Sequence, residues 1–267
     1  ALDRGELFLE YQPKIDVMTR TITGAEALLR WNSPSLGRIG PDEFIPVAEL
    51  AGVMPHIGDW VLRTACREAV AWQRLVRRPL HVAINVSPQQ FRNTDLLANV
   101  TQALVESGLP AAQLELEITE SVLVQDTPEA MRVFNALVDL GVTLSLDDFG
   151  TGYSSLSYLK KFPMRVLKID KAFVRDLGKR GNDESLVDAI IAMAHSLRMQ
   201  VVAEGVETEA QFAYLQQRGV EMVQGYYFSR PVSAGAFQEM IGIQEGDAPV
   251  TARITKDRRS AGLVGAA

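Results

Sequence analysis

Cysteine and histidine are scarce in this chain of 267 residues, which has one cysteine and three histidines. Cys66 alone cannot form an internal disulfide, and its place in the helical-looking stretch 64–72 is typical of a buried, inert thiol in a reducing compartment. His56, His81 and His195 are too far apart in the sequence to give the ligand spacing of a zinc site. The composition therefore argues against a zinc enzyme, a thiol enzyme and a disulfide-stabilised secreted domain.

Positive charge is not in excess either, because 27 Lys and Arg residues are set against 33 Asp and Glu residues and the net charge is −6. A domain of this charge has no general electrostatic affinity for polynucleotide phosphates, so we expect no polynucleotide partner. A small anion can still bind if metal ions supply the positive charge.

Long apolar runs are also missing: no stretch of 18 apolar residues occurs, and residues 1–10 are too charged for a signal peptide. We therefore expect a cytoplasmic domain without membrane contact of its own, even if the full-length protein is membrane-anchored. The chain opens without an initiator Met in a helical-looking stretch, so we expect it to be a piece of a longer protein with further domains upstream.

Short β-rich runs alternate with longer helical patterns along most of the chain. Such alternation predicts parallel strands with crossover helices, and eight units fit a closed (β/α)8 TIM-like barrel of the α/β class. The predicted strands are 8–12, 24–31, 81–86, 114–119, 143–147, 166–169, 201–203 and 222–227, and the predicted helices include 46–51, 61–75, 94–107, 128–140, 184–197 and 207–218. We expect the barrel to span residues 1–245 and residues 246–267, which lose the periodicity, to form a C-terminal tail.

Polar residues recur at or near the ends of these predicted strands. Barrel enzymes carry their chemistry on the rim formed by the carboxyl ends of the strands, so these side chains should converge there. The side chains are Glu26, Asn85, Glu117, Asp147 with Asp148, Lys168, Glu204 and Gln224, at separations of 59, 32, 30, 21, 36 and 20 residues.

Strand alternation sharpens this prediction. In the strand 114–119 the apolar residues alternate with Glu115 and Glu117, which should point into the barrel while their neighbours pack outward. Glu115 lies one layer deeper than Glu117, so we assign it to a structural ion pair rather than to catalysis. Ionised carboxylates inside a barrel are costly unless they are paired or bind metal.

An oxygen-rich set of five acids and one amide is the kind of site that Mg²⁺ or Mn²⁺ prefers. The set is generous for one ion and suits two ions that share a carboxylate. The alternative interpretation is that these residues are solvated strand-end acids and loop caps, which is where polar residues commonly lie.

At this point the sequence resembles the EAL domain family. The resemblance covers residues 1 to about 240 and is carried by eight ordered motifs. They are YQP at 11–13, GAEALLRW at 24–31, INVSP at 84–88, LELEITES at 114–121, LDDFGTGYSS at 146–155, LKID at 167–170, VAEGVET at 202–208 and QGYYFSRP at 224–231. The chain departs from the family pattern at Met164, Arg165 and Leu50, none of which lies in these motifs.

The resemblance implies a barrel with one antiparallel strand, cyclic di-GMP as substrate and linear 5′-pGpG as product. The ligand set fits two Mg²⁺ or Mn²⁺ ions, and we expect Ca²⁺ to inhibit because its longer bonds and looser geometry would misplace the water and the phosphate. Carried over by motif, one metal's ligands are Glu26, Asn85, Glu117 and Asp147, and the other's are Asp147, Asp148 and Glu204. Lys168, together with Glu204, is implied in catalysis, because Lys168 matches the residue that holds the attacking water.

The same carry-over supplies substrate contacts and a loop. The implied substrate contacts are Gln12, Arg30, Asp170, Gln224 and Pro231, and the implied supporting residues are Glu120, Phe149, Gly150, Gly152 and Glu207. The glycine-rich segment 148–155 could instead be a phosphate-cradling loop, although it lacks the P-loop lysine, or a tight turn after a strand. The resemblance favours a loop that couples a dimer contact to the metals, with Glu120 as its anchor.

Two functional hypotheses follow from the resemblance. The first is a metal-dependent phosphodiesterase specific for cyclic di-GMP, acting as a homodimer with sensory or GGDEF domains upstream. The second is a cyclic di-GMP receptor that has the fold but no turnover. Receptors in this family usually lose metal ligands or the lysine, and this chain retains all of them, which favours the enzyme.

Overall fold

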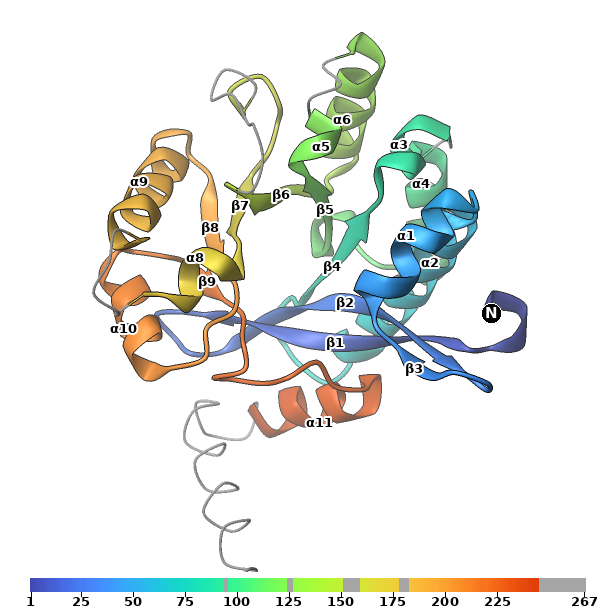
Figure 1. Ribbon diagram of the computed structural model, residues 1–267, viewed down its shortest axis with the longest axis horizontal. Coiled ribbons are helices and arrows are strands. Elements are labelled where there is room, and N and C mark those ends of the chain that lie inside the picture. The colour runs from blue at the N-terminus through green and yellow to red at the C-terminus, as the bar shows by residue number, and fades with distance from the viewer. Residues whose placement is uncertain (94–95, 124–126, 151–158, 178–182, 245–267) are drawn as a thin grey trace, which may run out of the picture.

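Strand pairing closes the main sheet into a barrel (Figure 1). The chain is described here by a computed structural model over residues 1–93, 96–123, 127–150, 159–177 and 183–244. The barrel strands, in chain order, are β1 (Leu7–Asp16), β2 (Ile22–Ser33), β4 (His81–Val86), β5 (Leu114–Thr119), β6 (Thr143–Phe149), β7 (Val166–Ile169), β8 (Gln200–Ala203) and β9 (Met222–Val223). They follow one another around the barrel, with β1 bonded to both β2 and β9, and β3 (Gly37–Ile39) extends β2 at one edge.

One barrel strand runs against the others, as the family resemblance implies. β1 is antiparallel to β2 and to β9, whereas each of the remaining barrel pairs is parallel. The cause is the short connection after Asp16, whose carboxylate accepts hydrogen bonds from the backbone and hydroxyl of Thr19 at 2.7 and 2.8 Å. So short a turn can join only antiparallel neighbours, because a parallel pair needs a crossover of a dozen or more residues.

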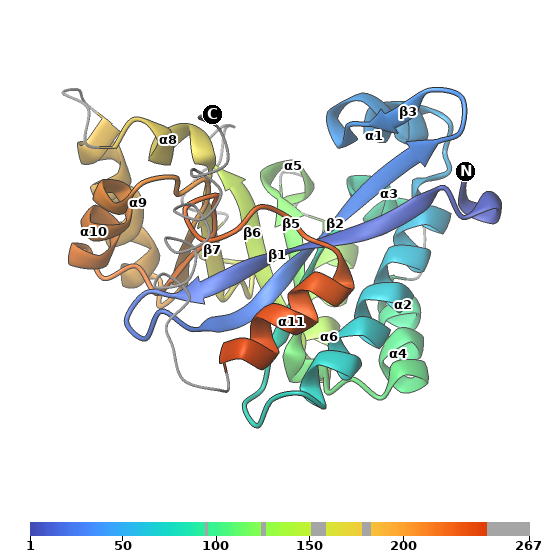
Figure 2. The same ribbon diagram turned by 90° about the horizontal axis from the view of Figure 1, so that it is seen from below.

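Helices surround the barrel (Figures 1 and 2). They are α1 (Pro41–Leu50), α2 (Met54–Gln73), α3 (Pro88–Asn93), α4 (Leu96–Ser107), α5 (Glu120–Leu123), α6 (Pro128–Leu140), α8 (Lys171–Arg175), α9 (Asp183–Ser196), α10 (Glu209–Gln217) and α11 (Ala234–Gln244), with 3-10 turns η1 (Leu2–Arg4) and η2 (Ala111–Gln113). Within the described ranges, none of these helices combines the length and the apolar character that crossing a bilayer requires.

The sequence placed most of these elements correctly, and the differences have local causes. The last strand was predicted to run to residue 227, but it ends at Val223 because the chain turns onto the loop after β8. A side chain at Gly225 would lie 2.1 Å from the carbonyl oxygen of Val206, so only glycine permits this approach. Neither β3 nor α11 was predicted. Residues 246–267 lie outside the described ranges, and the domain boundary stays a prediction.

The helix α11 covers β1, which no crossover helix follows. Trp72 of α2 packs edge-on against Tyr11 of β1, with ring centroids 4.9 Å apart, and Phe237 of α11 lies 4.6 Å from Trp72. All three side chains are buried, as is Cys66, whose thiol pKa burial raises to about 12. The buried, inert cysteine expected from the sequence is therefore confirmed.

Strand alternation decides what fills the barrel. In β5 the buried Leu114, Leu116 and Ile118 belong to the apolar layer shared with the helices. Glu115 and Glu117 point the other way and meet the ammonium of Lys14 at 3.0 and 2.8 Å. The prediction that Glu115 forms a structural ion pair is confirmed, and Lys14, Glu115 and Glu117 place charged groups inside the barrel.

Candidate active site

Lys168 is the centre of the acidic cluster. Its Nζ lies 2.6 Å from Glu204, 2.7 Å from Glu117, 3.0 Å from Asp147 and 3.8 Å from Glu26. The four carboxylates come from β2, β5, β6 and the residue after β8, so four separate segments of the barrel contribute them. The side chain of Lys168 is only 1% exposed, which makes each of these contacts strong.

Glu26 differs in position from the other members. It lies in the middle of β2, paired with Gln12 of β1 and with Ala83 of β4, rather than at the end of its strand as the sequence suggested. β2 continues well past the barrel rim together with β1 and β3, as Figure 2 shows. The carboxylate of Glu26 reaches the cluster because the rim crosses β2 at its midpoint.

Amide side chains hold Glu26 in place. Asn85 donates to its Oε1 at 2.7 Å, and Gln224 donates to its Oε2 at 2.6 Å. Gln224 donates also to Gln12 at 2.9 Å, and Gln12 donates to the carbonyl of Ser229 at 3.1 Å. The chain therefore brings together residues from β1, β2, β4 and the segment after β9 in one hydrogen-bonded group.

A β-bulge shapes the segment that carries Asp147 and Asp148. The register between β6 and β7 shifts between Leu146 and Phe149, and Asp148 adopts a φ of 54°, which is uncommon for a non-glycine residue. In a regular strand the side chains of Asp147 and Asp148 would point to opposite faces, and the bulge interrupts this alternation. Partial burial and the neighbouring carboxylates of Asp147 and Asp170 raise the pKa of Asp148.

The carboxylates of the cluster differ sharply in acidity. Burial raises the pKa of Glu26 to about 8, helped by Glu117, and burial raises the pKa of Glu204 to about 7. Burial acts on Glu117 in the same direction, but the ammoniums of Lys14 and Lys168 lower its pKa to about 2. Burial alone would lower the pKa of Lys168, and the surrounding carboxylates, Glu117 foremost, raise it well above its ordinary value. In this arrangement Lys168 is an ammonium and Glu117 an anion.

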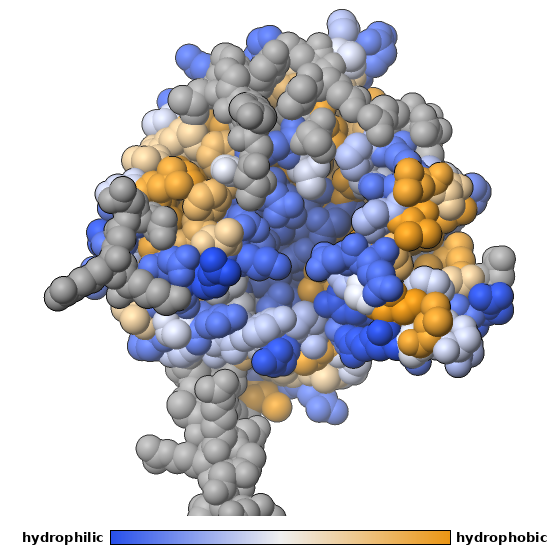
Figure 3. Space-filling model, viewed as in Figure 1, coloured by the Kyte–Doolittle hydropathy of each residue, from blue (hydrophilic) through white to orange (hydrophobic). Residues whose placement is uncertain are grey.

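A hydrophilic recess opens above this cluster in the face seen in Figure 3. The cavity has a volume of about 460 Å³ and includes five of the predicted metal and substrate residues. Its lining also includes Lys171, Arg175 and Tyr226, which sequence reasoning missed. The residues lining it are Gln12, Glu26, Leu28, Asp147, Lys171, Ala172, Arg175, Glu204, Gly205, Glu207, Gln224, Gly225 and Tyr226.

Three predicted substrate contacts do not line the cavity. Arg30 donates from Nε to Glu10 at 2.8 Å and from one terminal nitrogen to the carbonyl of Leu29 at 2.9 Å. Asp170 caps helix α8 by accepting from the backbone of Ala172 at 2.8 Å. Pro231 is partly buried beyond the end of β9. Their roles toward the substrate therefore stay predictions.

The loop after β6 is described only at its start. The backbone N–H of Gly150 donates to Glu120 Oε1 at 2.9 Å, and Gly150 has a φ of 99°. Phe149 is 8% exposed and belongs to the core. Gly152 lies outside the described residues. Glu120 thus fixes the point where the chain leaves the bulge that carries Asp147.

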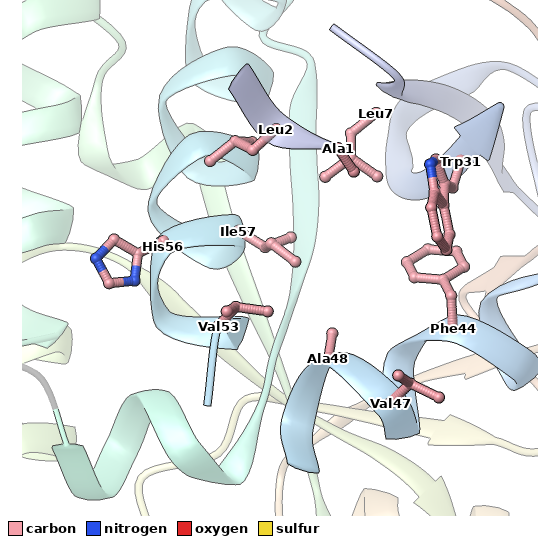
Figure 4. Close-up of a pocket in the computed structure, with 10 residues that line it drawn as sticks. All are labelled: Ala1, Leu2, Leu7, Trp31, Phe44, Val47, Ala48, Val53, His56 and Ile57. Carbon is pink, nitrogen blue, oxygen red and sulfur yellow. The ribbon is translucent and has the colours of Figure 1, made fainter. Parts of the chain in front are cut away.

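A second hollow of about 430 Å³ lies away from the acids, between η1, β2, α1 and α2 (Figure 4). Its walls are largely apolar, with Val53, Ile57 and Trp31 facing the shared space while His56 turns away from it (Figure 4). It offers no set of polar groups suited to phosphate chemistry, so the acidic recess is the candidate active site.

The donor chemistry of the recess fits a divalent metal. Carboxylate and amide oxygens are the ligands that Mg²⁺ and Mn²⁺ prefer, and Gln224 Oε1 is buried without a hydrogen-bond partner. Among the described residues, no three acidic, histidine or cysteine side chains already converge on a metal-sized position. The reason is geometric: the ammonium of Lys168 lies between the carboxylates and spaces them around itself.

A family model described as the EAL domain matches residues 1–231. The chain belongs to the EAL domain family. This EAL domain is 42% identical over 248 residues to the cyclic di-GMP phosphodiesterase NbdA of Pseudomonas aeruginosa, with 93% of this chain and 32% of NbdA covered. It is 40% identical over 238 residues to the cyclic di-GMP phosphodiesterase PdeR of Escherichia coli, with 89% of this chain and 36% of PdeR covered.

A solved structure of the PaMucR phosphodiesterase in complex with c-di-GMP has a TM-score of 0.85 to this EAL domain. The two are 41% identical, and the match covers 89% of this chain and 96% of that one. The chain thus spans about a third of the length of the curated relatives NbdA and PdeR, at 32% and 36%.

Proposed function

We propose that this EAL domain hydrolyses cyclic di-GMP to linear 5′-pGpG with the help of divalent metal ions. The observation that carries the proposal is the cluster of Glu26, Glu117, Asp147 and Glu204 around one buried lysine, at the floor of a cavity of about 460 Å³. Similarity to phosphodiesterases named for this substrate supports the choice of cyclic di-GMP.

The residues that would hold two Mg²⁺ or Mn²⁺ ions are Glu26, Asn85, Glu117, Asp147, Asp148 and Glu204. Bound metals would supply Lewis acidity and lower the pKa of a coordinated water. The chain itself contributes orientation: Asn85 and Gln224 hold both oxygens of Glu26, and the bulge lies in the segment that carries Asp147 and Asp148.

Lys168 orients the attacking water in this proposal. Its ammonium already contacts Asp147 and Glu204, so it lies among the groups expected around the nucleophile. The oxygen of water forms a bond to one phosphorus and the water loses a proton, the bond from phosphorus to the ribose 3′ oxygen breaks, and that oxygen takes up a proton. Cleavage of one such bond opens the ring and leaves a linear dinucleotide with a 5′ phosphate. This product is pGpG.

The second phosphate of the substrate would lie beyond the cluster, where the cavity wall carries Lys171 and Arg175. Gln12, Arg30, Asp170, Gln224 and Pro231 are the further substrate contacts that we propose from the family motifs. In the longer protein, sensory or cyclase domains upstream, homodimerisation and a cytoplasmic location are likewise proposals. The bifunctional relative MucR, named as a diguanylate cyclase and phosphodiesterase, illustrates such a combination.

Incubation of the domain with cyclic di-GMP and Mg²⁺, with products resolved by chromatography, tests the proposal. We expect pGpG to form with Mg²⁺, and not with EDTA or in an Asp147→Asn variant. Tight binding of cyclic di-GMP without any product would instead establish the receptor function and overturn the enzyme.

A further inference from the structure

A second buried lysine lies directly below the active site, and the proposed reaction does not use it. Lys14 of β1 is 2% exposed, and its ammonium contacts Glu117 Oε1 at 2.8 Å and Glu115 Oε2 at 3.0 Å. A lysine buried inside a barrel loses its hydration, so it is tolerated only where carboxylates pair with it. Lys14 thus joins the deeper layer of the barrel to the acidic cluster.

The two oxygens of Glu117 have different partners. Oε1 accepts a hydrogen bond from Lys14 at 2.8 Å, and Oε2 accepts one from Lys168 at 2.7 Å. The Lys168 ammonium is shared with Asp147 and Glu204, so Oε2 faces the acidic cluster. Oε1 faces the deeper layer that holds Lys14. Glu117 is 1% exposed, so bulk solvent does not reach Oε1.

Lys14 is itself held firmly. Glu115, on the same strand as Glu117, forms a second salt bridge with the ammonium of Lys14. The ladder between β1 and β2 shifts register directly after Lys14, and such irregularities re-aim the side chains beside them. The ammonium therefore has little freedom to leave Glu117.

We propose that Lys14 is a positioning residue that holds Glu117 Oε1 and thereby presents Oε2 alone to the metal site. Groups that orient a metal ligand from outside are worth about 10–100-fold in metal affinity or activity. The inference rests on the proposed metal-dependent function, since it assigns Glu117 as a ligand. Lys168 cannot take over this role, because it lies on the other oxygen.

The test compares two variants that change the same layer. Lys14→Met with Glu115→Gln removes the contact to Glu117 and leaves no unpaired charge at residue 115. Glu115→Gln alone is the matched control, since its amide oxygen can still accept from Lys14 while Lys14 keeps Glu117. Dissociation constants for Mn²⁺ are measured by calorimetry on the metal-free proteins without substrate.

We expect Mn²⁺ to bind about 10-fold or more weakly to the double variant, and within about 3-fold of the unchanged protein to Glu115→Gln. The half-saturating Mn²⁺ concentration for hydrolysis should rise by the same factor, while kcat at saturating Mn²⁺ changes less. Equal Mn²⁺ affinity in the two variants would overturn the role of Lys14.

Two controls keep the outcome decisive. Asp147→Asn must weaken Mn²⁺ binding; if it does not, the proposed metal site fails rather than the role of Lys14. If circular dichroism shows the double variant to be unfolded, Lys14→Gln with Glu115→Gln replaces it. The glutamine side chain is one bond shorter than that of lysine and uncharged, so it no longer reaches Glu117 Oε1 at hydrogen-bond distance. Mn²⁺ affinity equal to that of Glu115→Gln would then contradict the proposal.

Discussion

Gln224 donates a 2.6 Å hydrogen bond to Glu26, a residue 198 positions earlier in the chain. Gln224 follows β9, the last strand of the barrel, and Glu26 lies in β2, so the bond spans the place where β1 closes the sheet. The acidic cluster is therefore complete only when the barrel is closed.

Replacing Asn85 by Ala should abolish most turnover and leave the fold intact. The Asn85 side chain is exposed and, among the described residues, makes one hydrogen bond, to Glu26, so its loss should cost only about 1 kcal/mol of stability. Loss of a metal ligand should lower turnover by at least the ~10–100-fold that is typical when a residue that only orients a ligand is removed. Hydrolysis rates and thermal melting are compared with Gln89→Ala on α3, and near-unchanged turnover in Asn85→Ala would remove it from the ligand set.

Replacing Lys168 by Met should destabilise the metal-free protein and remove hydrolysis while cyclic di-GMP still binds. The substitution leaves the carboxylates of the cluster without their shared cation, and breaking a buried pair from one side costs about 3–5 kcal/mol. Mg²⁺ or Mn²⁺ should restore much of that loss, because the ions replace the missing charge.

Thermal melting with and without metal checks this, with the exposed Lys160→Met as control. A melting temperature of Lys168→Met that does not respond to metal would contradict the shared site. If the affinity for cyclic di-GMP and the turnover fell in equal proportion in Lys168→Met, the proposed action of Lys168 on the water would be contradicted.

Metal binding should release protons and tighten as the pH rises toward 8. An unfolded glutamate ionises near 4.5, whereas folded, metal-free Glu26 keeps its proton up to about 8. Between these values the folded state binds more protons than the unfolded state, so the metal-free protein loses stability as the pH rises. Glu204, with a pKa of about 7, acts in the same direction.

Calorimetry of Mn²⁺ binding in two buffers of different ionisation enthalpy counts the protons released. At pH 6.5 we expect release, and near pH 9 little, because both carboxyls are then already ionised. Binding heats that are identical in both buffers at pH 6.5 would show that the cluster is ionised before the metal arrives.

Mg²⁺ and Mn²⁺ should support hydrolysis, and Ca²⁺ should inhibit it. A carboxylate-rich site accepts Ca²⁺, but its longer bonds and looser geometry displace the water and the phosphate from each other. Rates are measured with each ion alone and with Ca²⁺ added to Mg²⁺. Comparable rates in Ca²⁺ alone would mean that the ions serve only to hold the substrate.

The domain should self-associate, and its specific activity should rise with protein concentration. Glu120 anchors Gly150, and the chain from Gly150 leads directly back to Asp147, so a contact near this loop can reach the site. A coupling of ~1–3 kcal/mol would change activity by ~5–150-fold. Glu120→Ala should weaken the concentration dependence, whereas substitution of the exposed Glu129 of α6 by Ala should not.

Light scattering alongside rate measurements checks this prediction. A strictly monomeric domain with constant specific activity would rule out the dimer and leave the metal assignment untouched. The loop residues beyond Gly150, including Gly152, lie outside the described ranges.

The sequence by itself determined the class of fold and the side chains that meet at the rim. β4, β5 and β7 begin and end at the predicted residues, because runs of apolar and β-branched residues with alternating polarity are local signals. The inward direction of Glu117 followed from the same alternation. Motif spacing, rather than any long-range contact, identified Lys168 and its carboxylate partners.

Only the tertiary structure decided how these side chains are arranged. The sequence did not predict that Lys14 contacts the cluster, because a lysine in a strand usually points to solvent. Lys14 nevertheless lies two residues after Gln12, on the same face of β1. The φ of 54° at Asp148 and the midstrand position of Glu26 depend on register with neighbouring strands. Register and buried pairing arise from contacts between residues far apart in the chain, which local periodicity does not encode.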